Sequence, residues 1–100
     1  MKAARIIEQE IKTQPEGTDE IVNINYIYIP KDFRKTRPRE YKVKKAIRYY
    51  QTHGYFDKPI SIYPEINTKK QPNRLIIVDE YTRLLAAINL KVKEIPVKYI

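Results

Sequence analysis

Residues 75–90, LIIVDEYTRLLAAINL, join a short apolar segment directly to a segment with helical periodicity. The apolar run at 75–78 is typical of a strand buried on both faces. Asp79 is a favoured N-cap residue, and Glu80 would lie in the first helical turn, where the helix dipole favours a negative charge. The spacing therefore predicts a strand that runs straight into a helix over 79–90. The predicted buried stripe of this helix consists of Tyr81, Leu84, Leu85 and Ile88.

Strand patterns lie on both sides of this unit. Residues 59–64, PISIYP, predict a short strand with Ile60 and Ile62 facing inward. Residues 94–100, EIPVKYI, predict a last strand in which Ile95 and Val97 are buried. Pro96 lacks an N–H group. We therefore expect either that this strand lies at an edge of the sheet or that its pairing begins at Pro96.

A basic helix is predicted over 38–53. Pro38 fits the first turn, and Gly54 suits the left-handed position that follows a helix. The core-facing stripe consists of Val43, Ala46, Ile47 and Tyr50. The basic residues fall off this stripe and face solvent or a ligand.

The N-terminal third completes the expected order of elements. Residues 21–30, IVNINYIYIP, predict one strand that stops at Pro30. Residues 2–13 predict a short helix, followed by a turn at Pro15 and Gly17. The order α-β-α-β-β-α-β predicts an α+β fold, a small mixed sheet flanked by helices. We expect residues 1–20 to form an N-terminal helix and loop and residues 21–100 to form a single domain.

The composition excludes several classes of function. The 100-residue chain has no Cys and one His, which rules out thiolate chemistry and argues against a His-based metal site or catalytic triad. No apolar run approaches the ~18 residues of a membrane span, and the N-terminus does not resemble a signal peptide. We therefore expect a cytoplasmic protein with no membrane contact. The acidic residues show no ligand spacing, so no catalytic or metal-binding residue is predicted.

Most of the net charge of +8 lies in one segment. Residues 31–48 contain nine basic and two acidic side chains, a net charge of +7. Such a concentrated positive field favours an anionic partner, although a solvated helix face would have the same composition. The candidate nucleic-acid contacts are Arg34, Lys35, Arg37, Lys42, Lys45 and Arg48. Nearby tyrosines either stack on single-stranded bases or cover the rim of the core; they are Tyr41, Tyr49, Tyr50 and Tyr55.

The junction at 78–83 is a candidate anion site. A strand that enters a helix presents unpaired N–H groups at the helix N-terminus, and Thr82 and Arg83 add phosphate donors. Glu80 opposes an anion there. The alternative is structural, with Asp79 as the cap and Arg83 paired to a carboxylate.

Several short motifs, in order, resemble the ParB N-terminal (ParB/sulfiredoxin-like, "ParB-like nuclease") family over about three quarters of the chain. The family reads QPR, then a helix ending near Gly, a Pro-Ile strand, a DGYTR or GERR junction with an Ala-rich helix, and VPV. The matching segments here are RPR at 37–39, GYFDKPI at 54–60, DEYTRLLAA at 79–87 and IPV at 95–97.

The resemblance implies a nucleotide site at the strand-to-helix junction. In partition proteins of this fold the site holds CTP and drives clamping on DNA, and related members are nucleotide-dependent kinases or nucleases. By position, the resemblance assigns phosphate or nucleotide contacts to Arg39, Gly54, Asp79, Thr82 and Arg83, with CTP or ATP and Mg²⁺ as the ligand.

The chain departs from the family at informative positions. Sulfiredoxin chemistry needs a Cys where this chain has Tyr81, so that chemistry is excluded. Glu80 replaces the family Gly, Thr82 replaces the first Arg of GERR, and Lys91 stands where a Gly would end the second helix. A lost Arg–phosphate hydrogen bond forfeits roughly 1.5–3 kcal/mol, and Glu80 adds repulsion.

Three functions fit these features. The first is a nucleic-acid-binding accessory module that contacts phosphates without sequence preference. The second is a nucleotide-binding enzyme of the same fold with a degenerate phosphate site. The third is a protein-interaction module whose basic face meets an acidic protein. The first is preferred because the charge concentration is read directly from the sequence.

Overall fold

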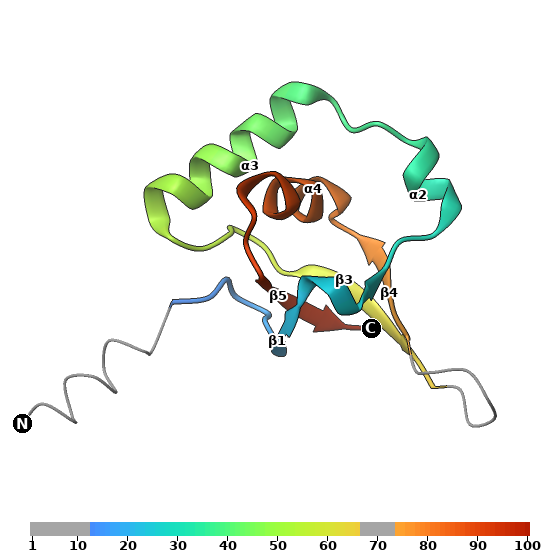
Figure 1. Ribbon diagram of the computed structural model, residues 1–100. Helices are drawn as coiled ribbons and strands as arrows, with labels where there is room; N and C mark the ends of the chain where they lie inside the picture. The colour runs from blue at the N-terminus through green and yellow to red at the C-terminus, as the bar shows by residue number, and fades with distance from the viewer. Residues whose placement is uncertain (1–12, 67–73) are drawn as a thin grey trace, which may run out of the picture.

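The computed structural model describes residues 13–66 and 74–100 (Figure 1). The strands are β1 (Glu20–Asn23), β2 (Ile27–Tyr28), β3 (Ile60–Glu65), β4 (Arg74–Asp79) and β5 (Glu94–Tyr99). The helices are the 3-10 helix η1 (Ile24–Tyr26), α2 (Lys31–Lys35), α3 (Glu40–His53) and α4 (Tyr81–Leu90). The predicted helix at 2–13 lies outside the described residues apart from its last residue, Thr13.

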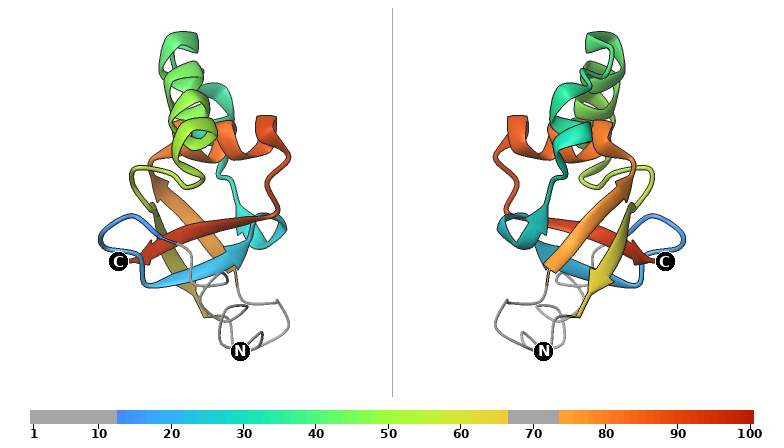
Figure 2. Two further views of the ribbon diagram at one scale, coloured as in Figure 1. Left: turned by 90° about the vertical axis from the view of Figure 1, so that its left-hand side faces the viewer. Right: turned by 90° about the vertical axis from the view of Figure 1, so that its right-hand side faces the viewer.

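The strands form one mixed sheet in the order β1-β5-β3-β4-β2. The β1–β5 and β3–β4 pairs are antiparallel, whereas β3–β5 and β2–β4 are parallel. The helices α3 and α4 pack against each other and lie on one side of the sheet (Figures 1 and 2). This arrangement confirms the predicted α+β class with a small mixed sheet flanked by helices. Among the described helices, none is long and apolar enough to cross a membrane.

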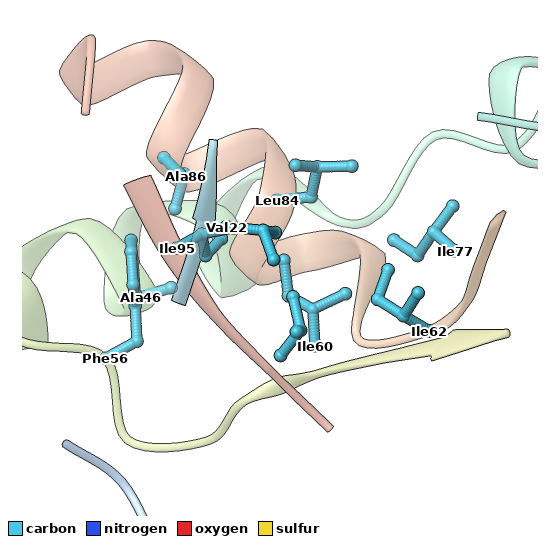
Figure 3. Close-up of a cluster of buried hydrophobic side chains, with 11 residues drawn as sticks. Val22, Ala46, Phe56, Ile60, Ile62, Ile77, Leu84, Ala86 and Ile95 are labelled. Carbon is cyan, nitrogen blue, oxygen red and sulfur yellow. The ribbon is translucent and has the colours of Figure 1, made fainter. Parts of the chain in front are cut away.

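The core lies between the sheet and the two longer helices (Figure 3). Ile60 and Ile62 of β3 and Ile95 and Val97 of β5 are almost completely buried, as their alternation predicts. The sheet also contributes Val22 and Ile77, and α4 contributes Leu84, Ala86 and Ala87. The small alanines let α4 lie close to its neighbours.

Helix α3 follows the prediction closely. Ala46 is buried, and Val43, Ile47 and Tyr50 pack against the core. Gly54 ends the helix with φ 81°, and its N–H donates to the Tyr50 carbonyl over 2.7 Å. The start differs, because Arg39 is the N-cap residue and Pro38 precedes it, outside the first turn.

The segment 21–30 is not one strand. It divides into β1 and β2, which lie at opposite edges of the sheet and are joined by η1. The turn between them is marked locally, because the Asn23 side chain accepts a hydrogen bond from the Asn25 N–H over 2.8 Å. Residues 31–35 then form α2, a short helix within the basic segment that periodicity did not predict.

Burial and strand position differ from prediction at three further places. Of the apolar run at 75–78, only Ile77 is fully buried, and Val78 is 42% exposed, because helices cover only one face of the sheet. Ile88 is 49% exposed, since α4 turns Leu84, Ala86 and Ala87 to the core instead. The strand β5 is not an edge strand. It tolerates Pro96 because its pairing with β3 begins one residue later, at Val97.

Lys91 follows α4 in the left-handed conformation, with φ 60° and ψ 33°. This is the position where the resembling family has Gly. Its N–H donates to the carbonyls of Ala87 and Ile88, so the left-handed turn caps the helix. The side chain makes this conformation costly, by roughly 1–2 kcal/mol relative to ordinary helical backbone.

We predict that Lys91→Gly raises the free energy of unfolding by about 0.5–1 kcal/mol, because relief of the left-handed strain exceeds the entropy that Gly adds to the unfolded chain. Chemical denaturation measures this change. The matched control is Lys93→Gly, since Lys93 has no positive φ; it should lower stability. Equal effects of the two substitutions would contradict the assignment of strain to position 91.

Candidate phosphate-binding groove

A groove of about 590 Å³ runs between α3 and the junction of β4 with α4. The α3 side contributes two lysines and two tyrosines, and the junction contributes Asp79 to Arg83. The side chains from α3 that line it are those of Tyr41, Lys42, Lys45, Ala46 and Tyr49. Phe33 of α2 and Asp57 from the loop before β3 complete the lining. The groove therefore lies where the family resemblance placed a nucleotide site.

The junction differs from the predicted helix cap. Strand β4 continues through Asp79, and Glu80 is the N-cap residue, in the left-handed region with φ 69° and ψ 37°. The Glu80 N–H donates to Asp79 Oδ1 over 2.7 Å, and the Glu80 carbonyl accepts from the N–H groups of Arg83 and Leu84. The backbone at position 80 thus has the conformation that favours Gly, although the residue is Glu.

Arg83 is held by two carboxylates. Its Nε and Nη2 atoms donate to Asp57 Oδ1 and Oδ2 over 3.1 and 2.8 Å, a bidentate pair. Its Nη1 lies 2.9 Å from Glu80 Oε2, within ion-pair distance but without hydrogen-bond geometry. The hydrogen bond with Asp57 raises the pKa of Arg83 and lowers the pKa of Asp57. The guanidinium that was a candidate phosphate donor is therefore already paired.

Two helix N–H groups remain for a ligand. In the part of the chain that the structure describes, the N–H groups of Tyr81 and Thr82 have no hydrogen-bond partner. Thr82 is half-buried and lines the groove. However, the Glu80 carboxylate lies at the same helix end, where it repels an anion.

The structure brings together only part of the predicted phosphate set. Asp79, Thr82 and Arg83 line one groove, whereas Arg39 and Gly54 do not. Gly54 serves as the left-handed cap of α3. Of the predicted nucleic-acid contacts, Lys42 and Lys45 line the groove; those outside its lining are Arg34, Lys35, Arg37 and Arg48. Arg34 also donates from Nε to the Ile29 carbonyl over 3.1 Å.

Sequence reasoning did not identify Asp57 as the partner of Arg83. The two residues are 26 positions apart, and no local pattern joins them. The alternative to an anion site paired Arg83 with a carboxylate and made Asp79 the helix cap. The pairing is confirmed. The predicted cap is wrong, because Glu80 is the N-cap residue. Among the described residues, no group of three or more acidic, His or Cys side chains has the geometry of a metal site.

The fold matches solved structures at low sequence identity. Sulfiredoxin from Arabidopsis thaliana has a TM-score of 0.65 at 20% identity, over 81% of this chain and 84% of that chain. The chain has the ParB/sulfiredoxin-like fold. A C-terminally truncated chromosome-partitioning protein ParB from Caulobacter crescentus, complexed with CTP-γ-S, has a TM-score of 0.59 at 17% identity over 81% of this chain. A mutant free serine kinase in complex with ADP has a TM-score of 0.62 at 15% identity over 91% of this chain.

These matches concern the fold alone. The chain spans 43% of the ParB chain and 34% of the serine kinase chain. No family model and no curated protein matches the sequence. The resemblance predicted from the motifs is thus confirmed as a shared ParB/sulfiredoxin-like fold.

The bidentate pair predicts a pH-dependent contribution to stability. Asp57→Asn should lower the free energy of unfolding at neutral pH by about 1–2 kcal/mol, because one partner of a partly buried ion pair loses its charge. The folded-state pKa of Asp57 is below its usual value of about 3.9. The stabilisation is therefore complete above that value and is lost as the pH falls through the folded-state pKa.

Urea denaturation of the wild type and the variant from neutral to acidic pH measures this effect, and the difference between the two should shrink at acidic pH. The control is Glu40→Gln, which breaks the exposed Lys44–Glu40 pair and should cost no more than about 0.5 kcal/mol. A difference for Asp57→Asn that is the same at every pH would contradict the role of this ion pair.

Proposed function

We propose that this domain is a nucleic-acid-binding accessory module that holds a phosphate backbone along α3. The observation that carries the proposal is the set of exposed, uncompensated cations over 31–48. Every Lys and Arg of this segment is exposed. Within the described residues, the only ion pair that any of them forms is Lys44 with Glu40, at 3.1 Å on a solvated helix face.

The contrast with Arg83 supports a long polyanion over a small nucleotide. Asp57 and Glu80 neutralise Arg83. The guanidinium to which the family resemblance assigns a phosphate contact is therefore already occupied. Lys42 and Lys45 line the same groove, and neither has a carboxylate partner among the residues described. Binding energy for phosphate is therefore available along α3 rather than at the start of α4. Contacts of this kind give salt-dependent affinity with little sequence preference.

Neutralising the α3 cations should weaken this binding and reduce its salt dependence. We predict that Lys42→Gln, Lys45→Gln and Arg48→Gln together lower duplex DNA affinity. A plot of log affinity against log salt has a negative slope, and the size of this slope should decrease by about 0.9 for each phosphate contact removed. Fluorescence anisotropy between about 50 and about 200 mM salt measures both quantities.

A matched control separates the α3 surface from total charge. Lys91, Lys93 and Lys98 are exposed and lie outside the basic segment, so their triple Gln variant has the same net charge as the α3 variant. It should retain nearly the wild-type slope. Equal losses in both triple variants, or no binding of wild type at low salt, would contradict the proposal.

A nucleotide-binding enzyme of the same fold is the second candidate. The observation that favours it is the groove itself, which is lined by Asp79, Thr82 and Arg83 in a fold whose solved members include complexes with CTP-γ-S and ADP. The Tyr81 and Thr82 N–H groups and the Thr82 hydroxyl would hold phosphate oxygens, and CTP or ATP with Mg²⁺ would be the ligand. The Glu80 carboxylate opposes this binding, so a tight triphosphate complex does not fit the wild-type groove.

Substitution of Glu80 tests whether a phosphate cradle remains. We predict that Glu80→Gly raises the increase in melting temperature caused by CTP, ATP or ADP with Mg²⁺, since the substitution removes both the charge and the side chain. Each shift is taken relative to the same variant without nucleotide, because Gly also relieves backbone strain. Glu80→Gln removes only the charge and should give a smaller effect. The absence of a shift in all three proteins at millimolar nucleotide would end this candidate.

A further inference from the structure

The groove contains aromatic side chains as well as cations. Tyr41 and Tyr49 lie on the groove side of α3, two turns or about 12 Å apart, with Lys42 and Lys45 between them. Tyr41 is 58% exposed, so its ring is available to a ligand. Two tyrosine rings that flank a pair of lysines along one helix form the pattern of a surface that binds bases and phosphates together.

The Tyr49 ring is held in place by its neighbours. It stacks on His53 at a centroid distance of 3.9 Å and an interplanar angle of 19°, and Tyr55 contacts it edge-on at 6.0 Å. On the opposite side of the groove, Tyr81 packs edge-on against Phe33 at 5.3 Å. A ring that is already fixed loses little side-chain entropy when a base stacks on it.

The charges within the groove set the orientation of a bound strand. The inner side carries Asp57, Asp79 and Glu80 against one cation, Arg83, whereas the α3 side carries Lys42 and Lys45. Phosphates are therefore attracted to α3 and repelled from the junction. Bases are uncharged and avoid this repulsion. In addition, a carboxylate oxygen of Asp79 can accept a hydrogen bond from an exocyclic amino group, as carboxylates do from cytosine.

We propose that the groove binds a single-stranded polynucleotide, with its bases stacked on Tyr41 and Tyr49 and its phosphates on the lysines of α3. This inference rests on the proposed nucleic-acid function and specifies its ligand. The bases of a duplex are stacked on one another and paired, so they cannot reach these rings. Asp79 further favours cytosine over thymine, which has no exocyclic amino group.

Fluorescence anisotropy with oligomers of about 16 nucleotides tests the inference. The probes are oligodeoxycytidylate, oligothymidylate, oligoribocytidylate and a duplex of mixed sequence. Wild type should bind the single strands more tightly than the duplex. Tyr41→Leu and Tyr49→Leu should each weaken single-strand binding on the order of tenfold, while duplex binding changes little. The control is Tyr63→Leu, because Tyr63 is 51% exposed and points to the other face of the sheet from the buried Ile62.

The base preference is tested in the same assay. Oligodeoxycytidylate should bind roughly twofold to tenfold more tightly than oligothymidylate, the range of one net hydrogen bond. Asp79→Asn replaces one carboxylate oxygen with an NH₂ donor, while the remaining oxygen can still accept from the Glu80 N–H, so the variant should lose or reverse that preference. The oligoribocytidylate arm shows whether the 2′-hydroxyl contributes, and similar affinity for both cytidylates supports stacking and phosphate contact as the shared mode.

The outcomes separate this inference from the proposed function. Salt-dependent binding that is equal for single strands and duplex, and unchanged by Tyr41→Leu, overturns the inference and leaves the phosphate-binding function intact. If wild type binds none of the nucleic acid probes at low salt, both the inference and the proposed function are overturned. Poly-glutamate that competes as well as DNA at equal charge would show a site for acidic proteins and also overturn the inference. Because Tyr41 is largely exposed, its substitution gives an answer even if Tyr49→Leu fails to fold.

Discussion

Arg83 binds Asp57 and Glu80 at once, and this cluster joins the loop before β3 to the start of α4. Glu80 reaches Arg83 from a left-handed backbone position, a conformation that costs an L-residue roughly 1–2 kcal/mol. The ion contact, together with the Glu80 carbonyl that accepts from two helix N–H groups, offsets that cost. The direction in which α4 leaves β4 therefore depends on the cluster, and so does the shape of the groove between α3 and α4.

The same cluster divides the groove electrostatically. With Asp79, the junction carries three carboxylates and one guanidinium, so it is net negative although the segment across from it is strongly basic. A small triphosphate in the groove would have to approach these carboxylates closely, whereas a polynucleotide can place its phosphates on α3 alone. The separation of charge thus favours a ligand that has both charged and uncharged parts along its length.

Local patterns in the sequence were sufficient to predict most helices and strands, but not how these elements are arranged in the sheet. Alternation identified the inward residues of β3 and β5, and Gly54 marked the end of α3, because each depends on neighbours in the chain. The division of 21–30 into two edge strands depends on pairing with β5 and β4, which periodicity does not encode. The Asn23 turn was the available local signal. The same holds for the candidate site. The strand-to-helix junction was predicted from local sequence, whereas the pairing of Arg83 with Asp57 depends on tertiary packing between residues that are 26 positions apart.

The unpaired cations of 31–48 lower the stability of the folded state, and this effect is relevant to function. Like charges held on one surface repel each other, and this repulsion destabilises the compact state. A structure that only needed solubility would distribute such charges or pair them with acids, as the Arg74–Glu65 pair on the sheet does at 2.7 Å. Here one carboxylate, Glu40, meets one of the nine cations among the described residues, and the remaining charge faces solvent beside aromatic rings. A polyanion bound along α3 would relieve that repulsion, so the feature that is unfavourable in the free domain becomes a source of affinity.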